Sequence, residues 1–557
     1  NYLAYNIYAT YNDTFADAHN VTITAGYNNE SWKSKDINVA AGNLSSSALD
    51  DLKLATGFAS DNNYGGGQNQ YVLSGIFGRV NYDYKGRYLF EASGRYDGSS
   101  RFGRGSRWGF FPSASLGWRI SEESFFAGAR DIVDNLKIRL SYGSLGNQNV
   151  SSYYTFLRLV SIKDFDSFTF GDGTIGKYSS LSAPIADDLT WEKANQYNLG
   201  IDYSMLNGRL NFTADAYIRD TKDMLTEGIA LPSVYGADVP DMNTADLRTK
   251  GYEIALSWRD NFQLFGNPFD YSVGFNLSDY RSEITKYDNP TKSFAKAYYV
   301  GMRIGEIWGY RTDGLFKTDE EAAQYAASHT FSSRLTGNLT GGWKAGDLKI
   351  LDLDGDGFIG ETGNETADAP GDRTIIGNSL PSLSYGITGS IRYFGFDVSV
   401  FFQGTGNHYW YPENQSMPFW GAYGYPYNSF IPTNFLDNVW AEDNPDAYFI
   451  RPRSNMSTGG YLRDANDRYL QNARYLRLKN LTVGYTIPAK VTKKAGIDQV
   501  RVYFSGENLH YWSPMKKHTK YVDPEAAIQR GDKTGADANN AFYPWQKTFM
   551  FGLDITF

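Results

Sequence analysis

The sequence lacks cysteine, has only five histidines and contains no long apolar run. Without cysteine, the chain has no disulfide framework, no thiolate metal ligand and no thiol nucleophile. A membrane-spanning helix needs about 18 or more consecutive apolar residues, and no segment reaches that length. The histidines show no metal-ligand spacing; they are His19, His329, His408, His510 and His518. These absences exclude thiolate–metal sites and cysteine catalysis.

Positive charge is also scarce. The chain has 53 basic and 62 acidic residues, a net charge of -9, and no basic run. Proteins that bind nucleic acid neutralise phosphates with clustered lysine and arginine, so we expect no nucleic-acid partner. Motifs for a zinc protease, a serine nucleophile or a phosphate-binding loop are absent, and acidic pairs such as Glu122 and Glu123 are merely adjacent. We therefore expect that the protein is not an enzyme and requires no cofactor.

Aromatic residues, in contrast, are abundant: 43 Tyr, 35 Phe and 12 Trp. In the last nine residues, 549–557, every second residue is apolar, as in a strand with one apolar and one polar face. Period-2 alternation predicts about fifteen such strands. They cover residues 1–11, 20–30, 71–83, 88–97, 108–120, 136–144, 197–203, 210–219, 250–259, 270–278, 383–394, 396–403, 475–487, 499–508 and 549–557.

Charged residues fall on only one face of these predicted strands. Burying a charge in each strand of a soluble core would be costly, whereas a water-filled lumen accepts it. The pattern therefore predicts an all-β fold, an antiparallel transmembrane β-barrel with lipid outside and water inside. A soluble, aromatic-rich β-protein is the alternative. The residues predicted to line the lumen wall are Arg79, Asp83, Glu91, Arg95, Asp202, Asp215 and Arg219.

The predicted connections alternate between short turns and long loops, as in outer-membrane barrels. An odd number of strands that begins in mid-pattern indicates that residues 1–557 are the C-terminal part of a larger barrel. We expect an N-terminal plug and the first strands to lie outside this chain. The predicted extracellular loops are 31–68, 146–187, 220–246, 284–381, 404–470 and 510–545.

Several segments in order along the chain resemble SusC/RagA-type TonB-dependent outer-membrane transporters of Bacteroidetes. They include Phe77-Gly-Arg-Val-Asn-Tyr-Asp-Tyr-Lys-Gly-Arg87, Arg95-Tyr-Asp-Gly-Ser-Ser-Arg-Phe-Gly103, Trp191-Glu-Lys-Ala-Asn-Gln-Tyr-Asn-Leu-Gly200, Tyr475-Leu-Arg-Leu-Lys-Asn-Leu481 and Asp523-Pro-Glu525. The resemblance implies a barrel of about 22 strands.

The resemblance further implies an N-terminal plug, a segment that contacts TonB, and a SusD-like surface lipoprotein. The function it implies is TonB-dependent import of oligosaccharides or oligopeptides across the bacterial outer membrane. An alternative from another class is a transporter-like barrel that serves as a structural subunit of a larger outer-membrane complex. The same barrel would suit both, so the sequence leaves the choice open.

An acidic motif at 352–359 matches the first half of a calcium-binding loop. Asp352, Asp354, Asp356 and the backbone carbonyl of Phe358 are the predicted ligands of a structural Ca²⁺. The match breaks at position 12, where Gly363 stands instead of a bidentate glutamate. A residue that folds back could replace it, and the candidates are Glu361, Glu365 and Asp372. The alternative is a solvated loop of Asx turns without metal.

The 404–440 region is rich in aromatics. Exposed aromatics in a long loop can stack on sugar rings or form an interface with a protein partner. The alternative is that they pack on one another or on the lipoprotein that the resemblance implies. The predicted substrate or partner residues are Trp410, Trp420, Tyr423, Tyr425 and Trp440. A smaller cluster, Arg101, Arg104 and Arg107, could contact anionic groups, although a solvated loop is the simpler interpretation.

Overall fold

The computed structural model describes most of the chain. Its described residues are 1–39, 42–44, 55–57, 64–150, 153–158, 160–169, 175–185, 189–228, 239–412, 414, 416–427, 431, 433, 435–519, 522–527 and 545–557. All the predicted long loops except 284–381 lie partly outside these residues. The chain divides into two compact units: residues 1–125, 137–199 and 217–248 form the first, and residues 126–136, 200–216 and 249–557 form the second.

A 15-stranded antiparallel sheet is the main element, and its order follows the sequence. Its strands are β1 (Tyr2–Phe15), β2 (His19–Val39), β5 (Tyr64–Tyr84), β6 (Tyr88–Ser99), β7 (Trp108–Arg119), β8 (Val133–Asn147), β11 (Glu192–Met205), β12 (Leu210–Glu227), β13 (Asp241–Leu264), β14 (Asn267–Lys286), β21 (Ser382–Tyr393), β22 (Phe396–Asn407), β25 (Tyr475–Thr486), β26 (Gln499–Trp512) and β27 (Thr548–Thr556). Each predicted strand corresponds to one of these.

The strands are longer than the alternation predicts, which corrects the loop boundaries. β2 and β5 pair from His19↔Tyr84 to Val39↔Tyr64, so the predicted loop 31–68 begins and ends as strand. β12 and β13 likewise extend into the predicted loop 220–246. The alternation fades there because the ends of the strands carry polar residues on both faces.

Tight turns join the strands at the predicted short connections. Asn207 and Gly208 have φ angles of 59° and 70°, the left-handed region that suits a hairpin between twisted strands. Lys85 and Gly86 repeat this geometry between β5 and β6. The longer connection at 121–135 contains the 3-10 helices η2 (Ile120–Glu122) and η3 (Ser124–Ala129).

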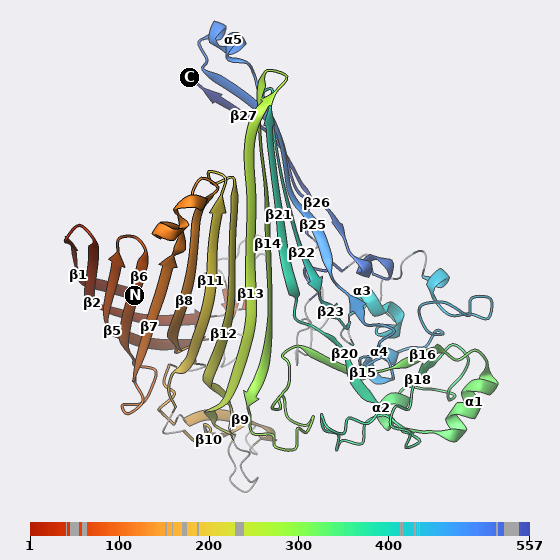
Figure 1. Ribbon diagram of the computed structural model, residues 1–557. Coiled ribbons are helices and arrows are strands. Elements are labelled where there is room, and N and C mark those ends of the chain that lie inside the picture. The colour runs from red at the N-terminus through yellow and green to blue at the C-terminus, as the bar shows by residue number, and fades with distance from the viewer. Residues whose placement is uncertain are drawn as a thin grey trace. The chain divides into compact units, whose positions relative to one another are not determined.

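In the second unit, a packed loop body lies at the end of the strands opposite to the β13–β14 turn and α5 (Ala489–Thr492) (Figure 1). Its regular elements are β15 (Glu306–Tyr310), β16 (Thr312–Leu315), α1 (Asp319–Ser328), β17 (Thr330–Phe331), α2 (Ser333–Thr336), β18 (Leu348–Ile350), β19 (Phe358–Ile359), β20 (Arg373–Asn378), β23 (Tyr409–Trp410), α3 (Met417–Trp420), η5 (Gly421–Tyr423), η6 (Leu436–Asn438), α4 (Met456–Gly459), β24 (Gln471–Asn472) and η8 (Pro514–Lys517).

Minor elements complete the fold. The first unit has two further hairpins, β3 (Gly42–Leu44) with β4 (Ala55–Gly57) and β9 (Val160–Thr169) with β10 (Ile175–Leu181). A 3-10 turn, η7 (Lys493–Ala495), follows α5. Among the described residues, none of the helices combines the length and the apolarity that crossing a membrane requires.

Candidate functional site

The strand register of the first unit creates a polar face. Thr22, Asn81, Glu91, Ser115 and Ser141 stand opposite one another on β2, β5, β6, β7 and β8. Cross-strand neighbours share a face of the sheet. These residues therefore form a continuous polar row across five strands.

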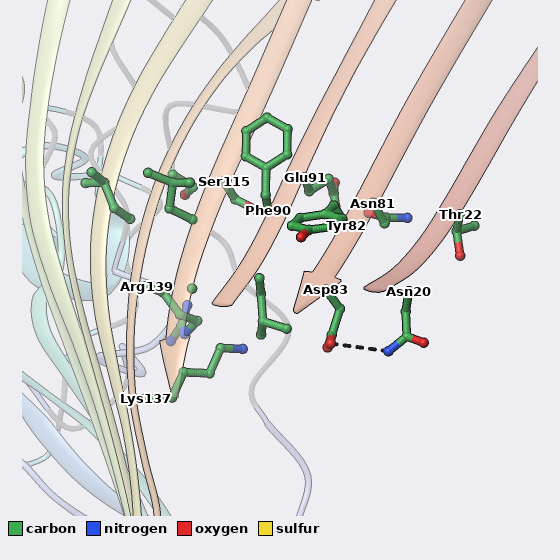
Figure 2. Close-up of a pocket in the computed structure, with 15 residues that line it drawn as sticks. Asn20, Thr22, Asn81, Tyr82, Asp83, Phe90, Glu91, Ser115, Lys137 and Arg139 are labelled. Atoms are coloured by element: carbon green, nitrogen blue, oxygen red, sulfur yellow. Dashed lines mark hydrogen bonds between the residues drawn. The ribbon is translucent and has the colours of Figure 1, made fainter. Parts of the chain in front are cut away.

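A hollow of about 430 Å³ lies on this unit (Figure 2). The Nδ2 of Asn20 donates to Oδ1 of Asp83 at 3.3 Å, and Asp83 also accepts from the backbone N–H of Gly86 at 2.7 Å. Lys137 and Arg139 line the hollow across from this pair. Charged groups of both signs line the hollow and are open to water.

Four of the predicted lumen-wall residues share the polar face of the first unit. In β5 and β6, Arg79, Asp83, Glu91 and Arg95 occupy alternate positions of paired strands. Arg79 and Glu91 form an ion pair at 2.5 Å, and Arg95 pairs with Asp97 at 2.8 Å. The arrangement is that of a wet wall with mutually neutralising charges.

The other three predicted wall residues are placed less fully. Asp215 lines a hollow of the second unit together with Thr213 and Glu253. Asp202 lies on β11 and Arg219 on β12. The role of all seven as a lumen wall stays a prediction.

The opposite face of the first unit is apolar. Val21, Tyr82, Phe90, Leu116 and Leu140 stand opposite one another on the same five strands. The exposed fraction of Leu116 is 53%. A cross-strand row of exposed apolar side chains needs an apolar partner, and hydrocarbon supplies one.

The loop body has the reverse arrangement, because its aromatic side chains are inside. Trp410 and Trp420 are completely buried, and Tyr423 and Trp440 are nearly so. The indole N–H of Trp420 donates to the carbonyl of Pro412 at 3.3 Å, and the Tyr423 hydroxyl donates to the carbonyl of Ile450 at 2.6 Å.

These contacts agree with the second interpretation of the aromatic loop, in which its side chains pack on one another. Phe419 and Trp420 meet edge to face with centroids 4.7 Å apart, so the aromatics pack on one another. Four of the five predicted residues are buried, and the fifth, Tyr425, is half-buried. The side chains of Trp410, Trp420, Tyr423 and Trp440 are hidden from a substrate in this conformation.

Two buried polar clusters that the sequence did not reveal hold the loops in place. Asp347 is fully buried and accepts from Arg453 at 2.6 Å and from the Tyr461 hydroxyl at 2.9 Å. The second cluster is Arg477 on β25, which pairs with Asp523 and, at 3.1 Å, with Glu525. The family-like segments 475–481 and 523–525 were the available signal, and the ion pairs of Arg477 bring them into contact.

The acidic motif of the loop body forms a carboxylate cluster, with different members from those predicted. Among the described residues, Asp352, Asp354 and Asp372 can bring carboxylate oxygens within 4.8 Å of one another. Asp356 is not in this group, and its carboxylate accepts from the backbone N–H of Phe358 at 2.7 Å. Asp372, sixteen residues after Asp356, takes its place. The Phe358 carbonyl stays a predicted ligand.

Asp372 is the residue that folds back into the motif. It accepts from the backbone N–H groups of Leu353 at 2.7 Å and of Gly360 at 3.1 Å. The other two candidates are engaged elsewhere: Glu361 pairs with Arg334 at 2.8 Å, and Glu365 accepts from the N–H of Gly363 at 3.0 Å.

The negative charges of the three carboxylates repel one another. Burial, together with the charges of Asp354 and Asp352, raises the pKa of Asp372. Asp352, in contrast, has a pKa below its ordinary value. Burial acts to raise this pKa, but the hydrogen bonds from the backbone N–H groups of Gly355 and Gly357 stabilise the carboxylate and outweigh burial. A hard cation with oxygen ligands would relieve the repulsion, so the donor set fits Ca²⁺.

The arginine cluster of the first unit is largely engaged within the protein. The Arg101 guanidinium lies 4.7 Å from the ring centre of Tyr71 and 4.9 Å from that of Tyr153. It also donates to the carbonyl of Gln148 at 3.3 Å, and Arg107 donates to the carbonyl of Phe102 at 3.4 Å. Arg104 is exposed. Two of the three arginines thus anchor the loop.

Comparison with known proteins gives consistent relatives. Residues 1–355 match the family model described as TonB dependent receptor-like, beta-barrel. TonB-dependent receptor P3 of Formosa agariphila is 28% identical over 569 residues, which is 99% of this chain and 52% of the relative. TonB-dependent receptor SusC of Bacteroides thetaiotaomicron is 30% identical over 496 residues, 87% of this chain and 44% of the relative.

Among solved structures, the RagAB peptide transporter shares the fold. It has a TM-score of 0.75 at 21% identity and matches all of this chain and 55% of the other. The chain thus spans about half the length of the relatives it matches. The matched family model, the 15-stranded antiparallel sheet and its two unlike faces agree: the chain belongs to the TonB-dependent receptor family and forms part of its β-barrel.

Proposed function

We propose that this chain is the barrel portion of a TonB-dependent importer in the bacterial outer membrane. It takes up oligosaccharides or oligopeptides together with a SusD-like surface lipoprotein. The apolar sheet face contacts lipid, the polar face lines the lumen, and the loop body faces outward. TonB acts through the region of the protein outside this chain.

The unlike faces of the sheet are the observation that carries this proposal. Exposed apolar rows on one side and hydrated charges on the other suit a wall between hydrocarbon and water. The relatives support the transport role, because their names describe TonB-dependent receptors and a peptide transporter. The packed loop body supports the lipoprotein partner, since a pre-organised surface binds at a lower entropic cost.

Deletion of the whole gene in the source bacterium tests the proposal. We expect loss of energy-dependent uptake of a labelled oligosaccharide or oligopeptide, restored by the wild-type gene. The protein should fractionate with the outer membrane, and a surface lipoprotein should co-purify with it in detergent. Unchanged uptake of all tested oligomers after deletion, with stable co-purification of assembly factors, would instead identify a structural subunit.

We also propose that the carboxylate cluster of the loop body binds a structural Ca²⁺. Asp352, Asp354 and Asp372 would supply ligands, and the Phe358 carbonyl would complete the motif. The ion would fasten the 352–360 segment to Asp372 and so stiffen the loop body. Binding should weaken as the pH falls, since protonation of Asp372, whose pKa is raised, removes a ligand.

Exchange of single carboxylates tests this second proposal. In the full-length protein, calcium should raise the melting temperature relative to a sample in chelator, and Asp372→Asn should abolish that shift. Asp356→Asn is the matched control from the same loop, and a smaller effect is expected because its carboxylate lies outside the cluster. A wild-type protein whose melting temperature is the same with calcium and with chelator contradicts the proposal.

A further inference from the structure

A row of charges crosses six neighbouring strands of the second unit near their short turns. Its members are Asp270 on β14, Arg392 on β21, Asp397 on β22, Gly484 on β25, Arg501 on β26 and Asp554 on β27. The register places the first four opposite one another in turn, and it also pairs Arg501 with Asp554. Tyr503 is the partner of Gly484, and Arg501, two residues away, shares its face. The charges alternate in sign, and glycine is the one uncharged member.

The Arg501 side chain crosses β25 to reach β22. Its Nε and Nη2 donate to the Asp397 carboxylate at 2.9 and 2.6 Å, and its Nη1 donates to Asp554 at 3.2 Å. Paired hydrogen bonds between a guanidinium and a carboxylate are strong and geometrically specific. The side chains of Arg501 and Asp397 are only 22% and 26% exposed, so water screens the pair only in part. One guanidinium therefore joins three strands, β22, β26 and β27.

Gly484 leaves the space through which this contact runs. A Cβ atom at residue 484 would lie 2.5 Å from Oδ1 of Asp397 and 2.6 Å from Nη2 of Arg501, too close for either atom to stay in place. The nearest residues of β25 on the same face are Thr482 and Thr486. If β25 slipped by two residues, one of these threonines would stand between Asp397 and Arg501 and block the contact.

The alternation of side chains does not fix the register of these strands by itself. A slip of one residue puts apolar side chains on the wrong face, but a slip of two residues keeps both faces correct. A tight turn removes this freedom between β21 and β22, where Phe394 and Gly395 have φ angles of 52° and 85°. Three other strand pairs are joined through long segments instead: β14 and β21 through 287–381, β22 and β25 through 408–474, and β26 and β27 through 513–547.

We propose that the charge row is a register lock, in which opposite charges and the glycine gap select the native pairing of strands that long segments join. Asp270 opposite Arg392 favours the native pairing of β14 with β21. The contact of Arg501 with Asp397 through the gap aligns β22, β25 and β26, and its contact with Asp554 aligns β27. A slip of two residues at any of these pairs separates opposite charges. The lock acts in folding and does not depend on the cargo.

Urea unfolding of the full-length protein in lipid vesicles tests whether the bridging contact acts as a unit. Asp397→Asn and Arg501→Gln should each raise the equilibrium constant of unfolding about tenfold. The double variant should be about as stable as Arg501→Gln alone, since both changes break the same contact. In a Gly484→Thr background, Asp397→Asn should change the constant less than about twofold, because the added side chain has already displaced the arginine.

Introduced cysteine pairs report the register directly, because the chain has no cysteine of its own. Ser399 and Thr482 are directly opposite, so Ser399→Cys with Thr482→Cys should form a disulfide in the native register. Asn480 stands opposite Phe401, so Ser399→Cys with Asn480→Cys should do so only after a slip of two residues. After refolding into vesicles and oxidation, this slipped pair should cross-link about tenfold more in the Gly484→Thr background than in the otherwise native protein.

Gly143→Thr is the matched control. Gly143 lies on the polar face of β8, where a Cβ atom would make an ordinary contact with Ser113 at 3.7 Å. This variant should keep the unfolding constant within about twofold and leave both cross-link yields unchanged. Additive effects of Asp397→Asn and Arg501→Gln overturn the lock, and so does a slipped cross-link that is as rare with Gly484→Thr as without it. If Gly484→Thr does not fold, the two carboxylate and guanidinium variants still decide the question.

Discussion

The sheet and the loop body place the same kinds of residues in opposite environments. On β27, Phe551 has an exposed fraction of 84%, and Phe549 and Leu553 on the same face of the strand are also exposed. In the loop body, Trp420 has an exposed fraction of 0%. The sheet therefore exposes apolar side chains on one face, whereas the loop body is built like a soluble domain around a buried core.

This contrast indicates that two different solvents shape one chain. Where hydrocarbon surrounds the strands, apolar side chains face outward at little cost and charges gather on the other face. Where water surrounds the loops, aromatics cluster inside and buried charges need partners, as Asp347 has in Arg453. The boundary between these two arrangements lies at the ends of the strands.

The largest expected effect is on the loop core. Trp420→Ala removes a fully buried aromatic and should cost about 3–5 kcal/mol of loop-body stability. The barrel strands should remain paired, because they share no part of that core. Hydrogen exchange by mass spectrometry would show faster exchange in 408–470 with unchanged protection of β21 and β22. Tyr427→Ala is the control, since that side chain is 93% exposed.

A charge on the apolar face should have the next largest effect. Leu116→Arg should destabilise the folded protein in lipid by about 2–4 kcal/mol if the residue lies near the bilayer midplane, because the charge would face hydrocarbon. Asp215→Asn, on the predicted wet side, should leave assembly intact. Urea unfolding of the full-length protein in lipid vesicles measures both. Equal destabilisation by the two variants would contradict the assignment of the faces.

The smallest effect is expected on the polar face. Arg79→Gln breaks the 2.5 Å ion pair with Glu91, yet both side chains are partly open to water. The loss should stay below about 1 kcal/mol and shrink further in high salt. The same unfolding assay at low and high salt measures it. A loss of stability as large as that caused by Leu116→Arg would show that this face is shielded from water, which would contradict the assignment of a polar and an apolar face.

The fifteen strands and their short turns could be predicted from local patterns. Alternation in 88–97 places Phe90 and Glu91 on opposite faces, and the register confirms this. Asn207-Gly208 predicts its turn because few residue pairs tolerate positive φ at consecutive positions. These signals are strong because each depends on residues close together in the chain.

The loops show how such reasoning fails. Trp410 and Trp420 have the composition of a binding surface, but contacts with distant residues bury them. Asp356 fits a metal loop by spacing, yet Asp372 joins the cluster because the chain folds back sixteen residues later. Likewise, nothing in the local sequence relates Arg477 to Asp523, which form an ion pair across 46 residues.

The sequence by itself determined the two-faced strands, their number and the places where they turn, since side-chain period and turn chemistry act over a few residues. Only the tertiary structure decided which aromatics are buried and which carboxylates meet. Those outcomes depend on loop closure across tens to hundreds of residues, and the free energy that selects them comes from contacts that no local pattern records.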